Sequence, residues 1–189
     1  MLRLFTGISL PASITQSLLL LQGGLQGARW RPEANFHITL AFIGEVDGNA
    51  AREIDSALSL IRAPAFDLRL KGMGQFGKDR PHTLWVGVEE NGLLSHLAQK
   101  HATALGNIGV KVERRKFVPH VTLAYLRDAR KDAVNSFAAH HAGYCSEWFH
   151  VNSWALFLSR LGKGASHYSV RAEYQLESAH EDFEVETAQ

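Results

Sequence analysis

Two histidine–threonine pairs recur in this chain of 189 residues. His-Ile-Thr-Leu occupies positions 37–40, and His-Val-Thr-Leu begins 83 residues later, at positions 120–123. Alternate side chains of a β-strand point to the same face. We therefore expect His37 and Thr39 to share one face of a strand, and His120 and Thr122 to share the equivalent face of another.

Two imidazoles and two hydroxyls around one space suit a phosphodiester. An imidazole has an ordinary pKa of about 6.5, so near neutral pH one can be protonated while the other is neutral. One histidine can then take a proton from water while the other gives one to the leaving oxygen. The threonine hydroxyls can donate to the non-bridging oxygens, where negative charge accumulates. This chemistry requires no metal.

Two other interpretations compete with this one. A single His-x-Thr word on a strand is usually an ordinary sheet histidine, and it is the duplication that favours a functional role. Two histidines can also bind a metal, but no Asp, Glu or Cys stands at ligand spacing, and threonine stands where a carboxylate would be needed. We expect neither a metal nor another cofactor.

The surrounding sequence predicts alternating strands and helices. In the first half, the expected elements are a strand at 2–8, a helix at 12–22, a strand at 36–43, a helix at 50–61 capped by Asp47, and strands at 66–71 and 82–89. In the second half, they are a helix at 93–105, a strand within 115–126, a helix at 129–140, and strands at 151–160 and 167–177. The order strand, helix, His-Thr strand, helix, strand, strand thus occurs twice, if 82–89 serves both halves.

A second repeated word supports a duplication. Gly77-Lys78 precedes His82, and 85 residues later Gly162-Lys163 precedes His167. Two pairs of words at nearly one offset predict a repeated unit of about 80 residues, longer than solenoid repeats. We expect one bilobal α+β domain over 1–189. Its repeat-like halves should lie at about 1–90 and 82–176, followed by a tail at 177–189.

Composition narrows the class of protein. The net charge of +1 gives no global basic field for long nucleic acids, although a local patch would suffice for a nucleic-acid end. Cys145 is the single cysteine, so neither an internal disulfide nor a CxxC site exists. Polar residues interrupt the apolar N-terminus, and no run approaches ~18 apolar residues. We expect a cytoplasmic protein without a signal peptide or membrane span.

The motifs and their flanks resemble the two-histidine (2H) phosphoesterase superfamily. The resemblance is to its bacterial RNA 2′,3′-cyclic phosphodiesterases, also called 2′-5′ RNA ligase-like proteins. It rests on the paired words and on their flanks, Trp30-Arg31-Pro32-Glu33 and Phe42 to Val46 around the first and Phe117 to Ala124 around the second. It covers residues 1 to about 176. It implies two lobes related by a pseudo-two-fold axis, two antiparallel sheets with helices outside, and an active cleft between the lobes without a metal.

The resemblance also implies roles for the motif residues. His37 matches the proton donor and His120 the proton acceptor, while Thr39 and Thr122 match the phosphate-binding threonines. The implied reaction opens a 2′,3′-cyclic phosphate on an RNA 3′ end, or on a small cyclic nucleotide, and leaves a 2′-phosphate. No membrane or obligate protein partner is expected. The alternatives are a 2′,5′-linked oligonucleotide phosphodiesterase, a 2′-5′ RNA ligase, or a module that binds RNA ends with little turnover.

One position departs from the family pattern. Family members often carry arginine five residues after the second histidine, where this chain has Tyr125, with Arg127 two residues later. The arginine is then lost, replaced by Arg127, or exchanged for a ring that stacks on a base. Arg31 and the basic run at 114–116 are further candidates for contacting a phosphate chain.

The remaining aromatic residues have competing interpretations. Phe42 could stack on a base, but strand alternation puts it on the face opposite His37, so core packing is favoured unless the strand bulges. Trp85, Trp148 and Trp154 are expected in the core.

Overall fold

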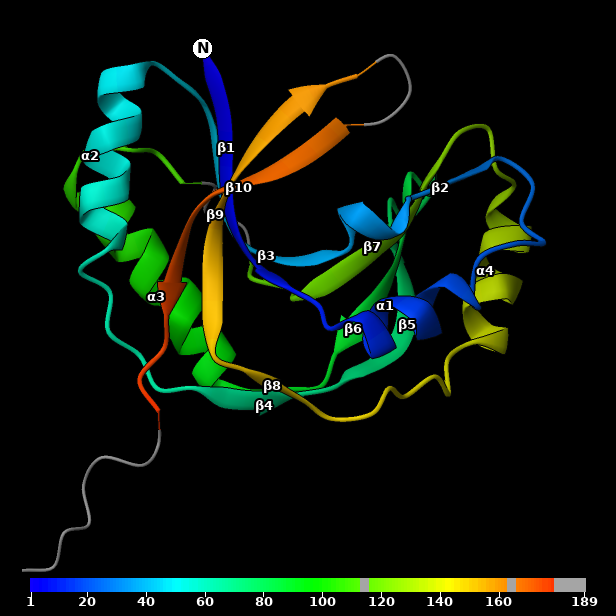
Figure 1. The fold of residues 1–189 in the computed structure, drawn as a ribbon. Coiled ribbons are helices and arrows are strands. Elements are labelled where there is room, and N and C mark those ends of the chain that lie inside the picture. The colour runs from blue at the N-terminus through cyan, green and yellow to red at the C-terminus, as the bar shows by residue number, and fades with distance from the viewer. Residues whose placement is uncertain (113–115, 163–165, 179–189) are drawn as a thin grey trace, which may run out of the picture.

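The computed structural model describes residues 1–112, 116–162 and 166–178 and has the expected α+β fold (Figure 1). Its elements are, in order, β1 (Leu2–Ser9), α1 (Ala12–Leu19), β2 (Ala28–Trp30), the short 3-10 helix η1 (Glu33–Asn35), β3 (His37–Val46), α2 (Gly48–Leu58), β4 (Phe66–Leu68), β5 (Leu70–Phe76), β6 (Thr83–Val88), α3 (Gly92–Asn107), β7 (His120–Leu126), α4 (Lys131–His140), β8 (Phe149–Val151), β9 (Ser153–Leu161) and β10 (Ser166–Gln175).

The duplicated order is present in these elements. The run β1, α1, β3, α2, β4, β5 is followed by the equivalent run β6, α3, β7, α4, β8, β9. The strand β2 and helix η1 are additions to the first run, and β10 follows the second. The strand expected at 66–71 is in fact two strands, because its two ends pair with different partners: β4 with β8, and β5 with β6.

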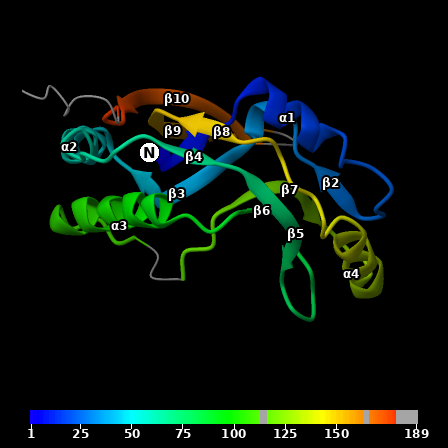
Figure 2. The same ribbon diagram turned by 90° about the horizontal axis from the view of Figure 1, so that it is seen from below.

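Two four-stranded antiparallel sheets form the two lobes (Figure 1). Their strand orders are β10-β9-β1-β3 and β2-β7-β6-β5, and β4 pairs with β8 in a separate two-stranded sheet. Each large sheet contains strands from both halves of the chain, since β9 joins β1 while β5 joins β6. The helices lie outside the sheets, with α2 and α3 at one end and α1 and α4 at the other (Figure 2).

Side-chain caps mark the starts of α2 and α3. The Asp47 carboxylate accepts hydrogen bonds from the backbone N–H groups of Asn49 and Ala50, at 2.8 and 2.9 Å, so the predicted cap of α2 is confirmed. Asn91 caps α3 in the same way through the N–H of Leu94. No helix in the described part of the chain is long and apolar enough to cross a bilayer.

One hydrophobic core connects the two sheets. Ile38 and Val121, the second residues of the two motifs, are both fully buried in it. The motif leucines Leu40 and Leu123 belong to the same core, and β3 contacts β7. The two histidine-bearing strands therefore meet at the junction between the lobes.

The tryptophans divide between core and surface. Trp154 is buried as expected and Trp85 is half-buried, but Trp148 is 57% exposed, so its assignment to the core is wrong. Trp148 lies just before β8, and the guanidinium of Arg69 lies over its ring at 4.7 Å. Stacking on a surface arginine replaces burial there.

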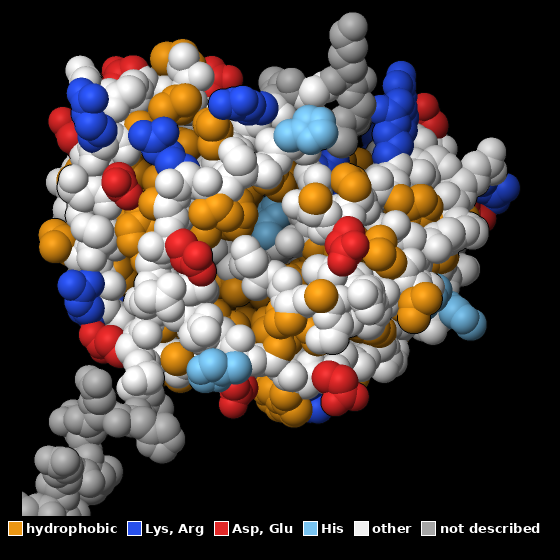
Figure 3. All heavy atoms as spheres, in the orientation of Figure 1, with side chains coloured by type: hydrophobic (Ala, Val, Ile, Leu, Met, Phe, Trp, Pro, Cys, Tyr) orange, Lys and Arg blue, Asp and Glu red, His pale blue; other side chains and the backbone are white. Residues whose placement is uncertain are grey.

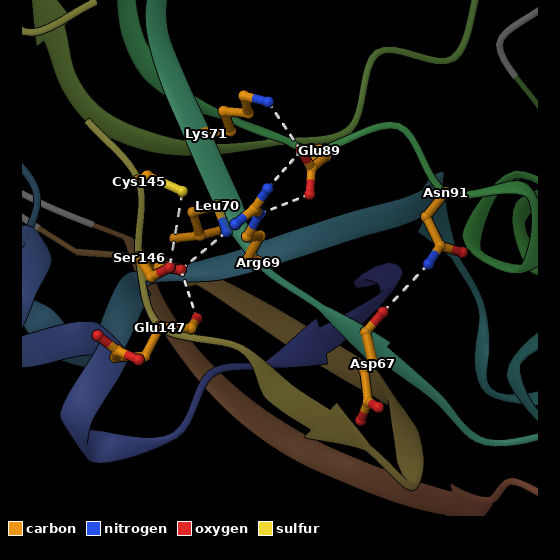
Figure 4. A network of polar contacts seen from close by, with 9 residues as sticks. All are labelled: Asp67, Arg69, Leu70, Lys71, Glu89, Asn91, Cys145, Ser146 and Glu147. Atoms are coloured by element: carbon orange, nitrogen blue, oxygen red, sulfur yellow. Dashed lines mark hydrogen bonds and ion pairs between the residues drawn. The ribbon is translucent and has the colours of Figure 1, made fainter. Parts of the chain in front are cut away.

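A polar network connects the segment before β8 to the second sheet (Figure 4). Arg69 and Lys71 both pair with Glu89, and the hydroxyl of Ser146 accepts a 2.9 Å hydrogen bond from the N–H of Leu70. The segment that precedes β8 is thereby held against the start of β5.

Candidate active site

The two motif strands have matching environments. Over their first seven residues, β3 and β7 show the same succession of half-buried, buried and exposed side chains. The histidine and threonine of each motif are half-buried, and the aliphatic residue between them is fully buried, as the alternation predicts. The face of the molecule in Figure 3 is hollowed near its centre, and a histidine side chain lies at the bottom of the hollow.

Both motif histidines are anchored through the same ring atom. Nδ1 of His37 lies 2.8 Å from the carbonyl oxygen of Asn35, and Nδ1 of His120 lies 2.7 Å from that of Val118. A carbonyl can only accept, so each Nδ1 carries the donated hydrogen and each neutral ring has its lone pair on Nε2. In the described part of the chain, neither Nε2 is used in a hydrogen bond.

Aromatic side chains surround both imidazoles. The ring of His37 lies 4.7 Å from that of Phe5, 5.2 Å from Tyr168 and 6.0 Å from Phe157. Phe76 and Trp85 flank His120 at 4.9 and 5.9 Å. These walls come from both lobes and reduce the contact of the rings with water.

This burial lowers the pKa of both imidazoles. It lowers the pKa of His37 to about 4, against the opposing effect of the Asn35 carbonyl, and positive charge on His120 and Arg31 lowers it further. Burial also lowers the pKa of His120, opposed by the Val118 carbonyl. Because His120 acts electrostatically on His37, protonation of one disfavours protonation of the other. In the ligand-free protein both rings are neutral at pH 7.

Matching bulges turn two aromatic side chains outward. Leu40 on β3 and Leu123 on β7 are each skipped in the pairing with the neighbouring strand. An extra residue of this kind reverses the alternation beyond it. Phe42 and Tyr125, two residues past the bulges, are therefore 42% and 46% exposed. The expectation that Phe42 packs in the core is wrong, and the bulge is the reason.

Of the candidate arginines that the structure describes, Arg31 and Arg127, only Arg31 lies beside the motif residues. Its N–H donates to the carbonyl of Leu123 at 2.8 Å, which continues the pairing of β2 with β7. Its guanidinium carbon lies 5.0 Å from the ring centre of Tyr125 on the second sheet and 6.0 Å from that of Tyr168 on the first. Arg127 lies elsewhere, with a side chain that is 72% exposed and faces Asp128 at 3.8 Å.

Of the basic run at 114–116, Arg114 and Arg115 lie outside the described residues. Lys116 is exposed. Among the described residues, no group of three or more His, Cys, Asp and Glu side chains lies close enough together to hold a metal ion.

Comparison with known proteins decides the family. A model of the LigT-like phosphoesterases matches the chain twice in tandem, over residues 8–85 and 86–167. The chain belongs to the LigT-like phosphoesterase family. The tandem match also confirms the duplication that the two repeated words predict.

Relatives of this LigT-like phosphoesterase are named RNA 2′,3′-cyclic phosphodiesterase. The one from Aeropyrum pernix is 43% identical over 100 residues, which are 52% of this chain and 57% of the relative. Matches to relatives from Geobacillus stearothermophilus and Thermotoga maritima also span only 31% and 55% of those proteins. The Escherichia coli K12 relative is 30% identical over 176 residues, which are 88% of this chain and 92% of that protein.

Solved structures agree with the family. A crystal structure of E. coli LigT complexed with 3′-AMP superposes with a TM-score of 0.77 at 27% identity, covering 93% of this chain and 98% of that one. A protein of Thermus thermophilus has the same TM-score at 23% identity, covering 94% of this chain and all of that one, which shows a shared fold. The expected two-lobed fold is thereby confirmed.

Several residues of this LigT-like site were missed in the sequence. Phe5, Phe76, Phe157 and Tyr168 line the histidines, yet none belongs to a histidine motif. Tyr168 directly follows the second repeated Gly-Lys…His word. That repeat was the sequence feature that could have pointed to Tyr168 as a site residue. The others reach the site only through sheet pairing, such as that of Phe5 with Phe157.

Proposed function

We propose that this protein hydrolyses 2′,3′-cyclic phosphate ends of RNA to 2′-phosphates, with His37 and His120 as acid and base. The water oxygen attacks phosphorus on the side opposite O3′, and Nε2 of His120 takes a proton from that water. The P–O3′ bond breaks, and Nε2 of His37 gives its proton to O3′. The products are a 2′-phosphate monoester and a free 3′-hydroxyl.

The matched anchoring of the two histidines carries this proposal. Both rings donate Nδ1–H to a backbone carbonyl, so Nε2 of each is without a hydrogen bond to the described residues, and both strands present a threonine one step further along the same face. Acid–base chemistry on two sides of one phosphorus needs such a pair of equivalent, oriented imidazoles. The names of the relatives point to the same substrate class.

The lowered pKa values of His37 and His120 in the ligand-free protein fit the proposed reaction. A bound phosphodiester brings a negative charge to the rings, and a nearby negative charge raises the pKa of an imidazole. The electrostatic opposition between His37 and His120 then favours one proton on the pair over two. The pair then holds one proton, so that one ring is the acid and the other is the base.

The proposal includes independence from metal ions. Its support is the donor set, because threonine stands in each motif where a metal site would need a carboxylate, and no metal-binding cluster occurs among the described residues. A cytoplasmic location is proposed from the single cysteine, Cys145, which is free and exposed.

The test is product analysis by phosphorus NMR. The four nucleoside 2′,3′-cyclic monophosphates and a short RNA with a cyclic phosphate end would each be incubated with the protein, with and without EDTA. We expect 2′-phosphates in every case and equal rates in EDTA. Formation of 3′-phosphates, or activity that EDTA abolishes and one divalent metal restores, would contradict the proposal.

Two further substrates separate the alternatives. Faster cleavage of a 2′,5′-linked dinucleotide than of the cyclic phosphates would assign the protein to 2′,5′-phosphodiester chemistry. Tight binding of 3′-AMP without turnover of any substrate would make it a binding module.

A further inference from the structure

We infer that Arg31 is a phosphate-binding residue of this site. Its guanidinium donates a hydrogen bond to a non-bridging oxygen of the phosphodiester, beside Thr39 and Thr122. This inference rests on the proposed function for the identity of the substrate. Its central observation, a buried cation without an anionic partner among the described residues, is independent of that function.

Arg31 is buried but incompletely paired. Its residue surface is only 7% exposed, and Nη2 is buried without a hydrogen-bond partner among the described residues. No carboxylate of the described residues lies within ion-pair distance of it. A buried guanidinium without an anion costs free energy, because the lost hydration is not replaced. An anionic ligand would supply the missing partner.

The position of Arg31 is set by backbone contacts and not by its charge. Its N–H donates to Leu123, and its carbonyl accepts a 2.8 Å hydrogen bond from the side chain of Gln22. Pro32 follows and fixes the entry into η1. The side chain is thus directed into the site by the pairing of β2 with β7, whether or not a ligand is present.

Arg31 lies where a phosphate held by both threonines would be within its reach. Leu123, its backbone partner, directly follows Thr122. The guanidinium lies between Tyr125 of one lobe and Tyr168 of the other, and Tyr168 also touches the ring of His37. Its charge is felt at His37, whose pKa it lowers. The same side chain is therefore close to the motif residues of both lobes.

The charge of the reacting phosphate predicts when this contact matters most. A cyclic phosphodiester carries one negative charge. Attack by a water that loses its proton to His120 puts more negative charge on the non-bridging oxygens in the transition state. A fixed cation at those oxygens stabilises the transition state more than the substrate. Loss of Arg31 should therefore lower kcat more than it raises KM.

Two substitutions separate binding from packing. Arg31→Lys keeps the positive charge and loses the planar group that lies over the two tyrosines. Arg31→Gln keeps a planar amide and loses the charge. Arg29→Gln is the matched control, because Arg29 lies on β2 two residues before Arg31 and pairs in register with Tyr125, but is exposed.

We expect Arg31→Gln to lose about 10²-fold or more in kcat, the usual effect of removing one donor to a developing oxyanion. Arg31→Lys should retain more of kcat, and Arg29→Gln should equal the wild type. Calorimetric titration with inorganic phosphate and with 3′-AMP should rank the affinities as wild type, then Arg31→Lys, then Arg31→Gln. The melting temperature of ligand-free Arg31→Gln should not fall, since a poorly paired buried charge is removed. In the same variant the pKa of His37, followed by NMR, should rise.

The opposite ranking would overturn the inference. If Arg31→Gln binds phosphate as well as Arg31→Lys or better, or if its activity loss follows only a fall in melting temperature, Arg31 has a packing role. The phosphate titration does not depend on turnover. If the wild type hydrolyses none of the cyclic phosphates, the proposed function fails while the titration still decides the role of Arg31.

Discussion

His37 and His120 are held by the same contact, a hydrogen bond from Nδ1 to the carbonyl oxygen of the residue two positions earlier. The two rings therefore share one tautomer and present the same atom, Nε2. What differs between them is the surroundings, because three aromatic rings pack against His37 and two against His120. The division of labour between acid and base must arise from the bound substrate and these surroundings.

Alanine at either histidine should lower the rate of cyclic phosphate hydrolysis by about 10²–10⁴-fold, the typical contribution of a positioned acid or base. If His37 is the acid, His37→Ala should be partly rescued by a nitrophenyl phosphodiester, whose leaving group departs without a proton. His120→Ala should not be rescued, since water still needs a base. Steady-state rates on both substrates check this.

This experiment also tests whether His37 is the acid, as the family resemblance implies, although its surroundings lower its pKa. The family resemblance makes His37 the acid, whereas its pKa of about 4 in the ligand-free protein makes it hard to protonate. Rescue of His120→Ala alone would reverse the assignment, and equal rescue of both variants would refute it. His82→Ala, at an exposed histidine outside the motifs, is the control and should keep wild-type rates.

Thr39→Val and Thr122→Val should each lower kcat/KM by about 10- to 100-fold, the effect of losing one hydrogen bond to a charged group at roughly 1.5–3 kcal/mol. Valine keeps the β-branched shape, so the melting temperature should change little. Hydrolysis rates and thermal melts of both variants check the two parts. Wild-type kcat/KM in either variant would remove that threonine from phosphate binding.

Gly74→Ala should damage the site from a distance. A Cβ added at Gly74 would lie 2.4 Å from the indole of Trp85, which flanks His120, so the ring must move. Overpacking of this kind costs about 1–3 kcal/mol, and the displaced indole should reduce activity.

The control for this substitution is Gly92→Ala at the first residue of α3, where an added Cβ meets no atom within 4 Å. It should leave hydrolysis unchanged and alter stability by no more than about 1 kcal/mol. Urea unfolding and hydrolysis assays test both variants. Equal stabilities for the two variants would show that the indole yields without strain.

Acid should destabilise the fold through its buried histidines. His101 is fully buried against Trp154, with Nε2 unpartnered among the described residues, and burial lowers its pKa to about 4. Above pH ~6.5 the ring is neutral in the folded and unfolded chain alike. Between that pH and 4, the unfolded chain binds a proton that the folded one refuses, so the free energy of unfolding falls as pH falls. The lowered pKa values of His37 and His120 act in the same direction.

His101→Phe should flatten this dependence while keeping an aromatic ring against Trp154. The loss of stability between pH 7.5 and 4.5 should shrink by up to about 3 kcal/mol, on the scale of 1.36 kcal/mol per pKa unit. Urea unfolding at the two pH values measures it. Parallel pH profiles for the variant and the wild type would exclude His101 as a source of acid sensitivity.

In the two motif strands, the sequence predicts part of the burial pattern of the side chains. Alternation along His37–Leu40 and His120–Leu123 predicts which side chains are buried, and it is right up to the two leucines. Beyond them it fails for Phe42, because the bulge at Leu40 depends on how β3 pairs with β1. Likewise, the expected strand at 66–71 is divided because its ends pair with β8 and β6, which lie elsewhere in the chain.

Neighbouring residues were enough to predict the two His-Thr faces, the cap at Asp47, the duplicated order of elements and, with them, the family. The pairing of β2 with β7, which directs Arg31 between Tyr125 and Tyr168, is known only from the folded chain. The two groups of features differ in the range of the interactions behind them. Strand alternation and helix caps involve residues a few positions apart, whereas sheet register and the burial of a charged side chain depend on partners that are distant in the chain and adjacent only after folding.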